Sequence, residues 1–183
     1  MKIIQSCGSL SWGGLEMITL NTSSKLSELG HDVTVLCSPG SKLEKESAEL
    51  NLRIEPLLRK KLNVISSIGK LKNILNKSEY DIIHTHLSND LWIIVPAVKL
   101  SSNSKKIKLF LTKHMASSVN KRDIPHRILY KRLNKIFAVS NFIKESVTET
   151  CPVKAEDVVV IPDTVSLKLY NPSLYEKKLL KKS

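Results

Sequence analysis

Short apolar runs and longer stretches with helical spacing alternate along the whole chain. The runs are rich in β-branched and other apolar residues, and they cover Lys2–Ser6, Asp32–Cys37, Leu52–Leu57, Asp81–Thr85, Ile107–Thr112, Ile136–Ser140 and Val158–Pro162. Several of them are apolar at almost every position, which is typical of strands buried on both faces. The pattern therefore predicts strands of a largely parallel sheet.

Helical spacing fills the intervals between these runs, over Gly14–Leu29, Asn63–Lys77, Asp90–Leu100, Ile124–Asn134 and Asn141–Cys151. The first helix has an approximate apolar face of Leu15, Ile18, Leu26 and Leu29, and Gly30 follows at a C-cap position. The second has a stripe of Val64, Ile65, Ile68, Leu71, Ile74 and Leu75. Repeated strand–helix–strand order predicts an α/β fold, namely a Rossmann-like doubly wound sheet with helices on both faces.

Two adjacent glycines, Gly13 and Gly14, follow the first predicted strand and open the first predicted helix. In open α/β sheets, ligands bind beyond the carboxyl ends of the strands. Glycines there let the backbone approach a ligand closely, and the helix directs its free N–H groups toward an anion. The spacing G-x-G-x-x-G of dinucleotide-binding proteins is absent, so a nicotinamide cofactor is not expected. The alternative is a tight turn that simply requires glycine.

Histidines close two of the predicted strands. His84 and His86 end the run Asp81–His86, and His114 ends the run Ile107–His114, directly after Lys113. On an ideal strand His84 and His86 share a face. Structural histidines are common, but two such sites at the ligand-binding edge favour a functional role. No third metal ligand can be placed, so no metal site is predicted.

Composition and charge narrow the possible function classes. The chain has 183 residues, 42% hydrophobic and 25% charged, with a net charge of +12. It contains no secretory signal and no apolar run long enough to span a membrane. Three separated cysteines fit reduced thiols better than a disulfide framework. A basic surface attracts nucleic acid, acidic lipid or phosphorylated substrates, unless it reflects only a preference for surface lysine.

Two basic stretches, Leu58–Lys77 and Lys121–Lys135, mix apolar positions with Lys and Arg. Basic amphipathic helices lie at anionic membrane surfaces. The simpler alternative is a surface helix with its apolar face in the core, and a third is a basic cleft wall for an anionic acceptor. Nucleic-acid binding is not expected, because no recognition motif is present and only 5% of residues are aromatic.

Seven motifs in order resemble the N-terminal half of a retaining glycosyltransferase of family four, the group-one type with the GT-B fold. They are GGLE at Gly13–Glu16, LSELGHDVTVL at Leu26–Leu36, YDIIHTH at Tyr80–His86, LTKH at Leu111–His114, IFAVSNFIKESV at Ile136–Val147, VVVIPDTVSLKLYNP at Val158–Pro172, and the strand before them. The resemblance covers Met1 to about Pro172.

The resemblance implies specific roles. Such enzymes have two Rossmann-like domains facing a cleft, with the acceptor on the N-terminal domain and most of the nucleotide-sugar donor on the C-terminal one. Gly13, Gly14 and Glu16 would lie near the donor phosphate, and His114 would contact the transferred sugar as the catalytic residue. His84, His86 and Lys113 would line the substrate site. The donor is a substrate, and no separate cofactor or metal is implied.

The domain organisation follows from the same comparison. Residues 1–172 would form the acceptor-binding domain, and residues 173–183 would begin a linker or helix, with the C-terminal donor domain absent from the chain. The family usually reads IPNGVD at the junction, whereas this chain reads IPDTVS from Ile161 to Ser166. Asp-Thr supports a tight turn less readily than Asn-Gly, which favours a divergent subfamily.

We therefore expect a domain that helps move a sugar from a nucleotide sugar to a glycan or lipid-linked acceptor, with retention, in cell-envelope polysaccharide or lipopolysaccharide synthesis. Activity would need the donor domain in cis or in trans, so the chain alone is expected to be inactive. The location would be cytoplasmic, including the inner face of the membrane. The alternative is a non-catalytic module that binds an acceptor or a partner.

Overall fold

A seven-stranded parallel sheet forms the centre of the molecule in the computed structural model, which describes residues 1–56, 64–116 and 119–163. The strands are β1 (Lys2–Cys7), β2 (Asp32–Cys37), β3 (Arg53–Pro56), β4 (Ile82–Thr85), β5 (Lys108–Lys113), β6 (Lys135–Ala138) and β7 (Val158–Val160). Each strand pairs in parallel with its neighbours, so the predicted α/β fold with a doubly wound sheet is confirmed.

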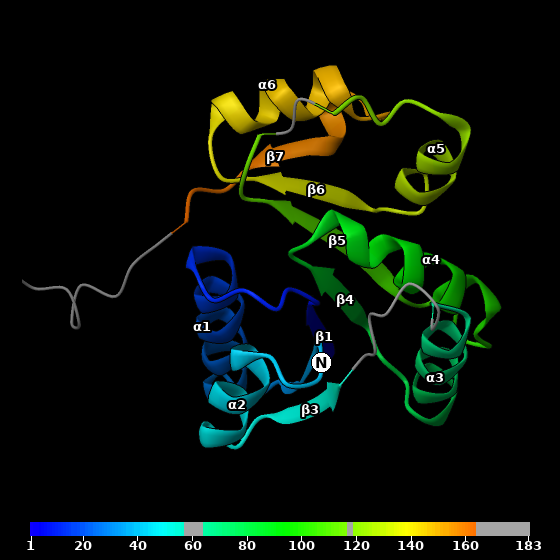
Figure 1. Cartoon of the computed structure of the whole chain (residues 1–183). Helices are drawn as coiled ribbons and strands as arrows, with labels where there is room; N and C mark the ends of the chain where they lie inside the picture. Colours follow the sequence, from blue (N-terminus) through cyan, green and yellow to red (C-terminus); the bar gives the residue numbers. More distant parts are fainter. Residues whose placement is uncertain (57–63, 117–118, 164–183) are drawn as a thin grey trace, which may run out of the picture.

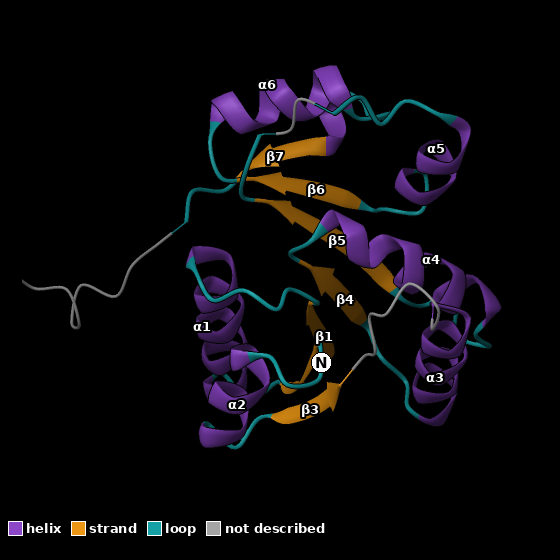
Figure 2. Ribbon diagram, in the orientation of Figure 1, coloured by secondary structure: helices purple, strands orange, loops and turns teal. Residues whose placement is uncertain are grey.

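Six α-helices alternate with these strands, as Figure 2 shows. They are α1 (Gly14–Glu28), α2 (Lys42–Glu49), α3 (Val64–Lys77), α4 (Leu91–Leu100), α5 (Ile124–Tyr130) and α6 (Asn141–Thr150). In Figure 1, α1 and α2 lie on one side of the sheet, and α3 and α4 lie on the other. Short 3₁₀ turns at Ser88–Asp90 and Ala155–Asp157 precede α4 and β7.

The strand order is β3-β2-β1-β4-β5-β6-β7. The chain therefore begins in the middle of the sheet, builds outward to β3, and then returns to the other side of β1 with β4. Such a reversal separates the connections that follow the two central strands and leaves a crevice at their carboxyl ends. The topology by itself places a ligand site beyond the ends of β1 and β4.

Two apolar clusters hold the layers together. The larger one contains the inner faces of α3 and α4 and the strands from β4 to β7, with Leu71, Ile83, Ile94 and Leu109 almost fully buried. The smaller one joins α1 and α2 to β1 and β2 through residues such as Leu20, Val35 and Leu43. All three cysteines are buried and none forms a disulfide with a described residue, and burial raises the pKa of the Cys37 thiol to about 12.

Helix α2 was missing from the expected elements. Its sequence, KLEKESAE, is mostly polar and buries only Leu43 and Ser47, so hydrophobic spacing gives no signal. The N-cap was the one indication of this helix that the sequence offered: the Ser41 hydroxyl accepts a hydrogen bond from Glu44 N at 3.2 Å. Serine followed three residues later by glutamate is a sequence signature of a helix start.

The buried face of α1 also differs from the expected one. The buried residues are Glu16, Thr19, Leu20 and Ser23, whereas Leu29 is exposed. Small polar side chains let the helix lie close to β1 and β2, and a hydrophobicity pattern cannot detect such a face. The C-terminal end agrees with the prediction: Gly30 has φ +82°, a left-handed conformation in which glycine is favoured.

The two basic stretches are helical over only part of their length within the described residues. Within Lys121–Lys135 only Ile124–Tyr130 is α-helical, and by Asn134 the backbone bonds to the sheet instead, with Asn134 N donating to Leu109 O. In α3, Leu71 and Leu75 face the core, but Ile65 is 87% exposed. The first part of Leu58–Lys77 and the predicted segment 173–183 lie outside the described residues. Within the described residues, no helix has the length and apolar character needed to cross a membrane.

Candidate functional site

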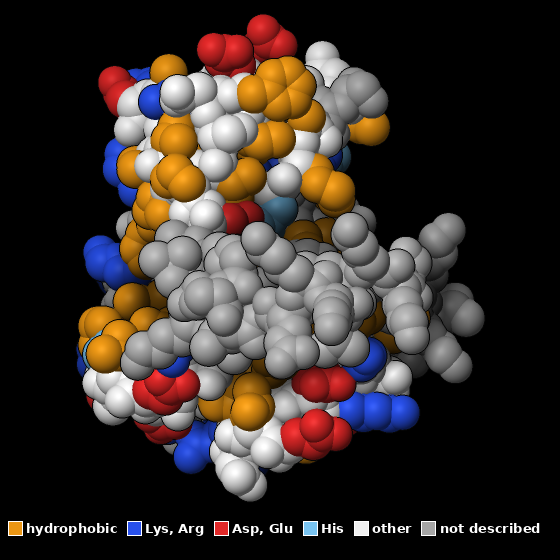
Figure 3. All heavy atoms as spheres, turned by 90° about the vertical axis from the view of Figure 1, so that its left-hand side faces the viewer, with side chains coloured by type: hydrophobic (Ala, Val, Ile, Leu, Met, Phe, Trp, Pro, Cys, Tyr) orange, Lys and Arg blue, Asp and Glu red, His pale blue; other side chains and the backbone are white. Residues whose placement is uncertain are grey.

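The residues singled out from the sequence lie at the carboxyl ends of β1, β4 and β5, which are neighbours in the sheet. Figure 3 faces this edge of the molecule and shows hydrophobic side chains gathered on its upper part. Segments that begin or end at the carboxyl ends of β5, β6 and β7 carry exposed apolar residues, namely Met115, Phe142 and Ile161. The edge is thus partly polar and partly apolar.

A continuous chain of hydrogen bonds crosses this edge. His86 Nε2 lies 2.9 Å from Gln5 Oε1, and His86 Nδ1 lies 3.1 Å from His114 Nε2. His114 Nδ1 in turn lies 3.2 Å from Asp163 Oδ2. The chain joins the inside of β1 to the segment after β7. The side chains of Gln5 and His86 are buried, whereas Asp163 is exposed, so the chain runs from the core to the surface.

His84 lies beside this chain on the same face of the sheet. Its Nε2 is 2.7 Å from Thr112 Oγ1, and its ring centroid is 4.4 Å from that of His86. The rings of His86 and His114 stack with centroids 5.4 Å apart. The structure therefore brings His84, His86 and His114 together, as the two strand-end motifs suggested.

Burial sets the protonation of the two inner rings. It lowers the pKa of His84 to about 4 and the pKa of His86 well below its usual value, and the neighbouring histidines add to both shifts. Both rings are therefore neutral at neutral pH. A neutral His86 that donates from Nε2 to the Gln5 carbonyl oxygen must accept at Nδ1.

The same reasoning assigns the donors and acceptors in the two contacts of His114. His114 Nε2–H donates to His86, and the Asp163 carboxylate can only accept from a proton on His114 Nδ1. The ring of His114 is thus fixed at both nitrogens by protein groups, one neutral and one anionic.

Neither glycine of the pair is required by the backbone. Gly13 is extended, with φ −161°, and Gly14 opens α1 without a positive φ. A Cβ at Gly14 would meet no atom within 4 Å, and one at Gly13 would meet only Glu16 Oε2 at 3.6 Å. The alternative of a tight turn that needs glycine therefore finds no support. What the glycines provide is open space against the backbone at the start of α1.

The first turn of α1 also lacks the side-chain cap that other helices have. Ser41, Asp123 and Ser140 each accept a hydrogen bond from a first-turn N–H of α2, α5 and α6. The N-cap of α1 is Gly13, which has no side chain. The carboxylate of Glu16 accepts from Gly13 N at 2.8 Å and is buried, so its observed role is to hold the turn. The N–H groups at positions 14–16 have no partner within the helix.

Two buried side chains fix the loop between β1 and α1. Asp90 Oδ2 accepts from Ser6 Oγ at 2.8 Å and from Gly8 N at 3.0 Å. Ser38 Oγ donates to Gly8 O at 2.7 Å. The carbonyl and the amide of Gly8 are thus held by the segments that follow β2 and β4, the two neighbours of β1, which fixes the direction in which the chain leaves β1 toward the glycines.

Lys113 is separated from the histidines. It alternates with Thr112 and His114 along the end of β5, so its side chain leaves the other face of the sheet. Its Nζ lies 3.2 Å from Ser88 Oγ, and burial followed by the charge of Lys121 lowers its pKa. Any substrate contact by Lys113 would therefore come from a different side than that of His114.

Sequence reasoning missed three residues of the site: Gln5, Asp90 and Asp163. Gln5 was visible as a polar residue inside an apolar strand, and Asp90 as an acid at the start of a helix. Asp163 was noticed only as a departure at a turn, and its contact with His114 depends on the end of β7 lying near β5. Within the described residues, no group of three or more His, Cys, Asp or Glu is placed to hold a metal ion.

The fold is that of known glycosyltransferases. A glycosyltransferase from Rickettsia africae superposes with a TM-score of 0.81 at 23% identity over 99% of this chain and 48% of that one. The Anabaena protein HepE, in complex with UDP and glucose, gives 0.71 at 16% identity over 94% and 48%. The apo form of the lipopolysaccharide outer core galactosyltransferase WaaB gives 0.63 at 18% identity over 91% and 47%.

The chain spans about half the length of these structures. It corresponds to one Rossmann-like half of a GT-B fold, as the motifs predicted. No curated protein sequence matches it. The model of Glycosyltransferase Family 4 matches residues 12–169, which includes the glycine pair, the histidine cluster and the junction. This chain therefore belongs to Glycosyltransferase Family 4.

Proposed function

We propose that this chain is the acceptor-side half of a retaining glycosyltransferase that moves a sugar from a nucleotide-sugar donor to a glycan or lipid-linked acceptor. The observation that carries the proposal is the open space at Gly14, beside an uncapped helix start and the histidine chain, at the reversal of strand order. The space accepts a ligand close to the backbone, and the free N–H groups suit a phosphate or a sugar hydroxyl.

His114 would act on the transferred sugar. Glycosyl transfer passes through an oxocarbenium-like transition state while a diphosphate leaves. The ring of His114 can donate a hydrogen bond to a sugar hydroxyl only after one of its present partners gives way. Asp163 is the exposed partner, so we propose that substrate binding displaces it from His114.

Glu16 would serve the site indirectly. Its carboxylate holds Gly13 N, and a negative charge against the donor phosphate would be unfavourable unless it stays so engaged. We therefore propose that Glu16 positions the glycine turn. His84 would help to align the rings of His86 and His114 through its tilted contact with His86, while the apolar residues at the same edge would face an acceptor or a second domain.

The wider role proposed is cell-envelope polysaccharide or lipopolysaccharide synthesis on the cytoplasmic side of the membrane. The similarity to WaaB, a lipopolysaccharide outer core galactosyltransferase, supports this role, and the UDP and glucose bound to HepE support a UDP-sugar donor. The donor sugar would be read by a second domain in cis or in trans.

A non-catalytic binding module is the second candidate. It is favoured by the engagement of both ring nitrogens of His114, which leaves neither free for a substrate in this state. In that case the edge of the sheet would hold an acceptor or a partner, and no transfer would follow.

A chimera separates the two candidates. The C-terminal half of the Rickettsia africae glycosyltransferase would be fused after this chain, and transfer from a panel of UDP-sugars to lipid-linked and free glycans would be measured. We expect turnover that His114→Ala lowers by about 10²–10³-fold. His126→Ala, at a half-buried histidine on α5 that takes no part in the histidine chain, is the control and should keep the rate.

Acceptor binding to the 183-residue chain alone would be followed in parallel by amide NMR shifts at Gly13, Gly14 and His114. Acceptor binding at these amides without transfer by a folded chimera would favour the binding module. A folded chimera without transfer, together with no shift at this edge for any acceptor, would reject both candidates.

A further inference from the structure

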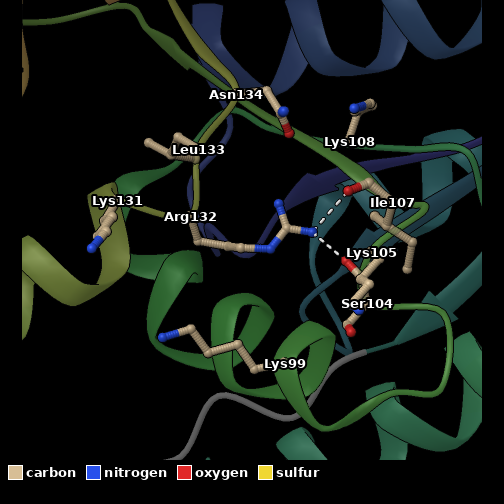
Figure 4. A pocket seen from close by; sticks show the side chains of 9 residues that line it. All are labelled: Lys99, Ser104, Lys105, Ile107, Lys108, Lys131, Arg132, Leu133 and Asn134. Atoms are coloured by element: carbon tan, nitrogen blue, oxygen red, sulfur yellow. Dashed lines mark hydrogen bonds between the residues drawn. The ribbon is translucent and has the colours of Figure 1, made fainter.

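A second, strongly basic cavity lies at the opposite edge of the sheet from the histidines. It has a volume of about 490 Å³ and is formed where β5 and β6 begin, by the end of α4 and the loops that lead into both strands (Figure 4). Small-molecule pockets have volumes of about 300–1,000 Å³. The cavity therefore has the size of a ligand site, and no part of it belongs to the site described above.

Five cationic side chains line this cavity, and no acidic residue does: Lys99, Lys105, Lys108, Lys131 and Arg132. They come from three separate segments of the chain. Within the part of the chain that the structure describes, none of the four lysines has a carboxylate at ion-pairing distance. Other lysines in the same molecule are paired: Lys25 with Glu28, Lys42 with Glu46, and Lys106 with Glu79. Lys106 gives the clearest comparison, because it follows Lys105 in the sequence and yet is paired with Glu79.

Arg132 is held in place with donors to spare. Its Nη2 donates to Ser104 O at 2.7 Å and to Ile107 O at 2.8 Å, and Figure 4 shows both bonds leaving one nitrogen of the guanidinium. The N–H groups on Nη1 and Nε make no hydrogen bond to the described residues. Asn134 is fixed similarly, because its Oδ1 accepts from Leu109 N at 2.9 Å and its amide nitrogen remains a donor.

A neighbouring hollow shares Lys131 and Leu133 with this cavity but differs from it in how its charges are paired. It contains Asp157, which pairs with Lys135 at 3.2 Å. Its arginines are also engaged, since Arg122 donates to Glu149 O and Thr148 O, and Arg127 Nε donates to Arg122 O. Most cationic groups of that hollow thus have a carboxylate or a carbonyl partner within the protein. The four lysines of the first cavity have no carboxylate partner among the described residues.

We propose that the cavity lined by Arg132 binds a phosphoryl group, as an anion site separate from the transferase edge. A fixed guanidinium offers paired N–H donors to phosphate oxygens, and the surrounding lysines supply point charges. A dianionic group would offset part of the positive charge of the cluster, whereas a neutral sugar would offset none. The phosphoryl group can belong to a free phosphate ester or to an acidic lipid headgroup, and the chemistry of recognition is the same.

The test uses the 183-residue chain and two probes. Inorganic pyrophosphate is titrated calorimetrically at low ionic strength, and binding to phosphatidylglycerol vesicles is measured by flotation against phosphatidylcholine vesicles. The cavity variant is Lys99→Gln/Lys108→Gln/Lys131→Gln. The matched control is Lys25→Gln/Lys42→Gln/Lys106→Gln, which removes the same charge from exposed positions. Thermal unfolding confirms that both triple variants fold.

We expect the cavity variant to bind at least about tenfold more weakly, because each charge-assisted contact contributes that much or more. The control should stay within about twofold of the parent chain, since none of its three lysines lines the cavity and the attraction between charges weakens with distance. Loss of pyrophosphate binding assigns the site to a free phosphate ester. Loss of vesicle binding with no pyrophosphate affinity in the parent chain assigns it to a lipid headgroup.

Three results would overturn the proposal. Equal weakening in both triple variants would show a response to net charge alone. Absence of binding to either probe at low salt would show that there is no site. Loss of pyrophosphate binding in His114→Ala, with full binding retained by the cavity variant, would place the anion at the transferase edge instead.

Discussion

His86 Nδ1 lies 3.1 Å from His114 Nε2, and this contact joins the ends of β4 and β5. Each ring is also held on its far side, His86 by Gln5 and His114 by Asp163. The outer ring therefore takes its orientation from a buried amide two strands away. A substitution at Gln5 should therefore change the orientation of the His114 ring.

Replacing Gln5 with leucine should destabilise the fold. His86 Nε2–H would lose its acceptor while remaining buried, and an unsatisfied buried group costs about 1–3 kcal/mol. Urea unfolding would measure this loss. Asn73→Leu, on the exposed side of α3, is the control and should change stability by less than about 0.5 kcal/mol. Equal effects of both variants would mean that the Gln5 contact contributes nothing to stability.

Stability should fall as the solution is acidified below the ordinary titration range of histidine. Burial lowers the folded-state pKa of His84 to about 4, against 6.5 for a free histidine. Between these values the unfolded state binds more protons than the folded state, so the free energy of unfolding decreases as pH falls. The contribution of His84 alone is about 3 kcal/mol at most.

His84→Gln removes this titration. Urea midpoints at pH 7.5, 5.5 and 4.5 should therefore fall less steeply for this variant than for the parent chain. His31→Gln, at a solvent-accessible histidine after α1, should leave the slope unchanged. A parent chain whose stability is flat over this interval would show that His84 and His86 are not kept neutral by burial.

Gly14→Ala should leave the fold intact and weaken ligand binding. The added methyl meets no atom and the backbone needs no left-handed conformation, so stability should be unchanged or higher by up to about 1 kcal/mol. Gly30→Ala forms the contrast, because φ +82° there makes alanine unfavourable by about 1–2 kcal/mol. Thermal unfolding of both variants would show the difference, and acceptor titration by NMR would show the loss of binding in Gly14→Ala. Full acceptor affinity in that variant would mean that no ligand approaches the backbone there.

Asp90→Ala should loosen the turn between β1 and α1. The change leaves Ser6 Oγ and Gly8 N without their acceptor, which costs about 2–3 kcal/mol for a buried charged partner. Hydrogen exchange at the Gly8 amide should become much faster. Asp157→Ala removes a surface ion pair with Lys135 and should cost less than about 1 kcal/mol. An unchanged exchange rate at Gly8 would show that Ser38 alone is sufficient to hold the loop.

The fold could be predicted largely because its strands are apolar on both faces and its helices mostly are not. That contrast failed for α2 and for the buried face of α1, where serine, threonine and glutamate take positions usually held by leucine. The proximity of His84, His86 and His114 could be predicted, because strand ends in a parallel sheet share an edge. The contact between His114 and Asp163 could not, since it depends on where the chain turns after β7.

The basic cavity escaped sequence reasoning for a similar cause. Lysines at positions 99, 105, 108 and 131 look like ordinary surface charge in a chain with 29 basic residues. Only the fold shows that the end of α4 and two separate loops bring them around one arginine, while Lys106 turns to Glu79.

The strand order has a further consequence for how the molecule forms. Gln5, His86, His114 and Asp163 are linked by contacts between residues 81, 28 and 49 positions apart. Contacts between distant positions form late, because a long intervening chain must first be ordered. β7 must therefore dock before Asp163 can hold the ring of His114, and a polypeptide growing on the ribosome lacks the complete series of hydrogen bonds until the segment after β7 has emerged.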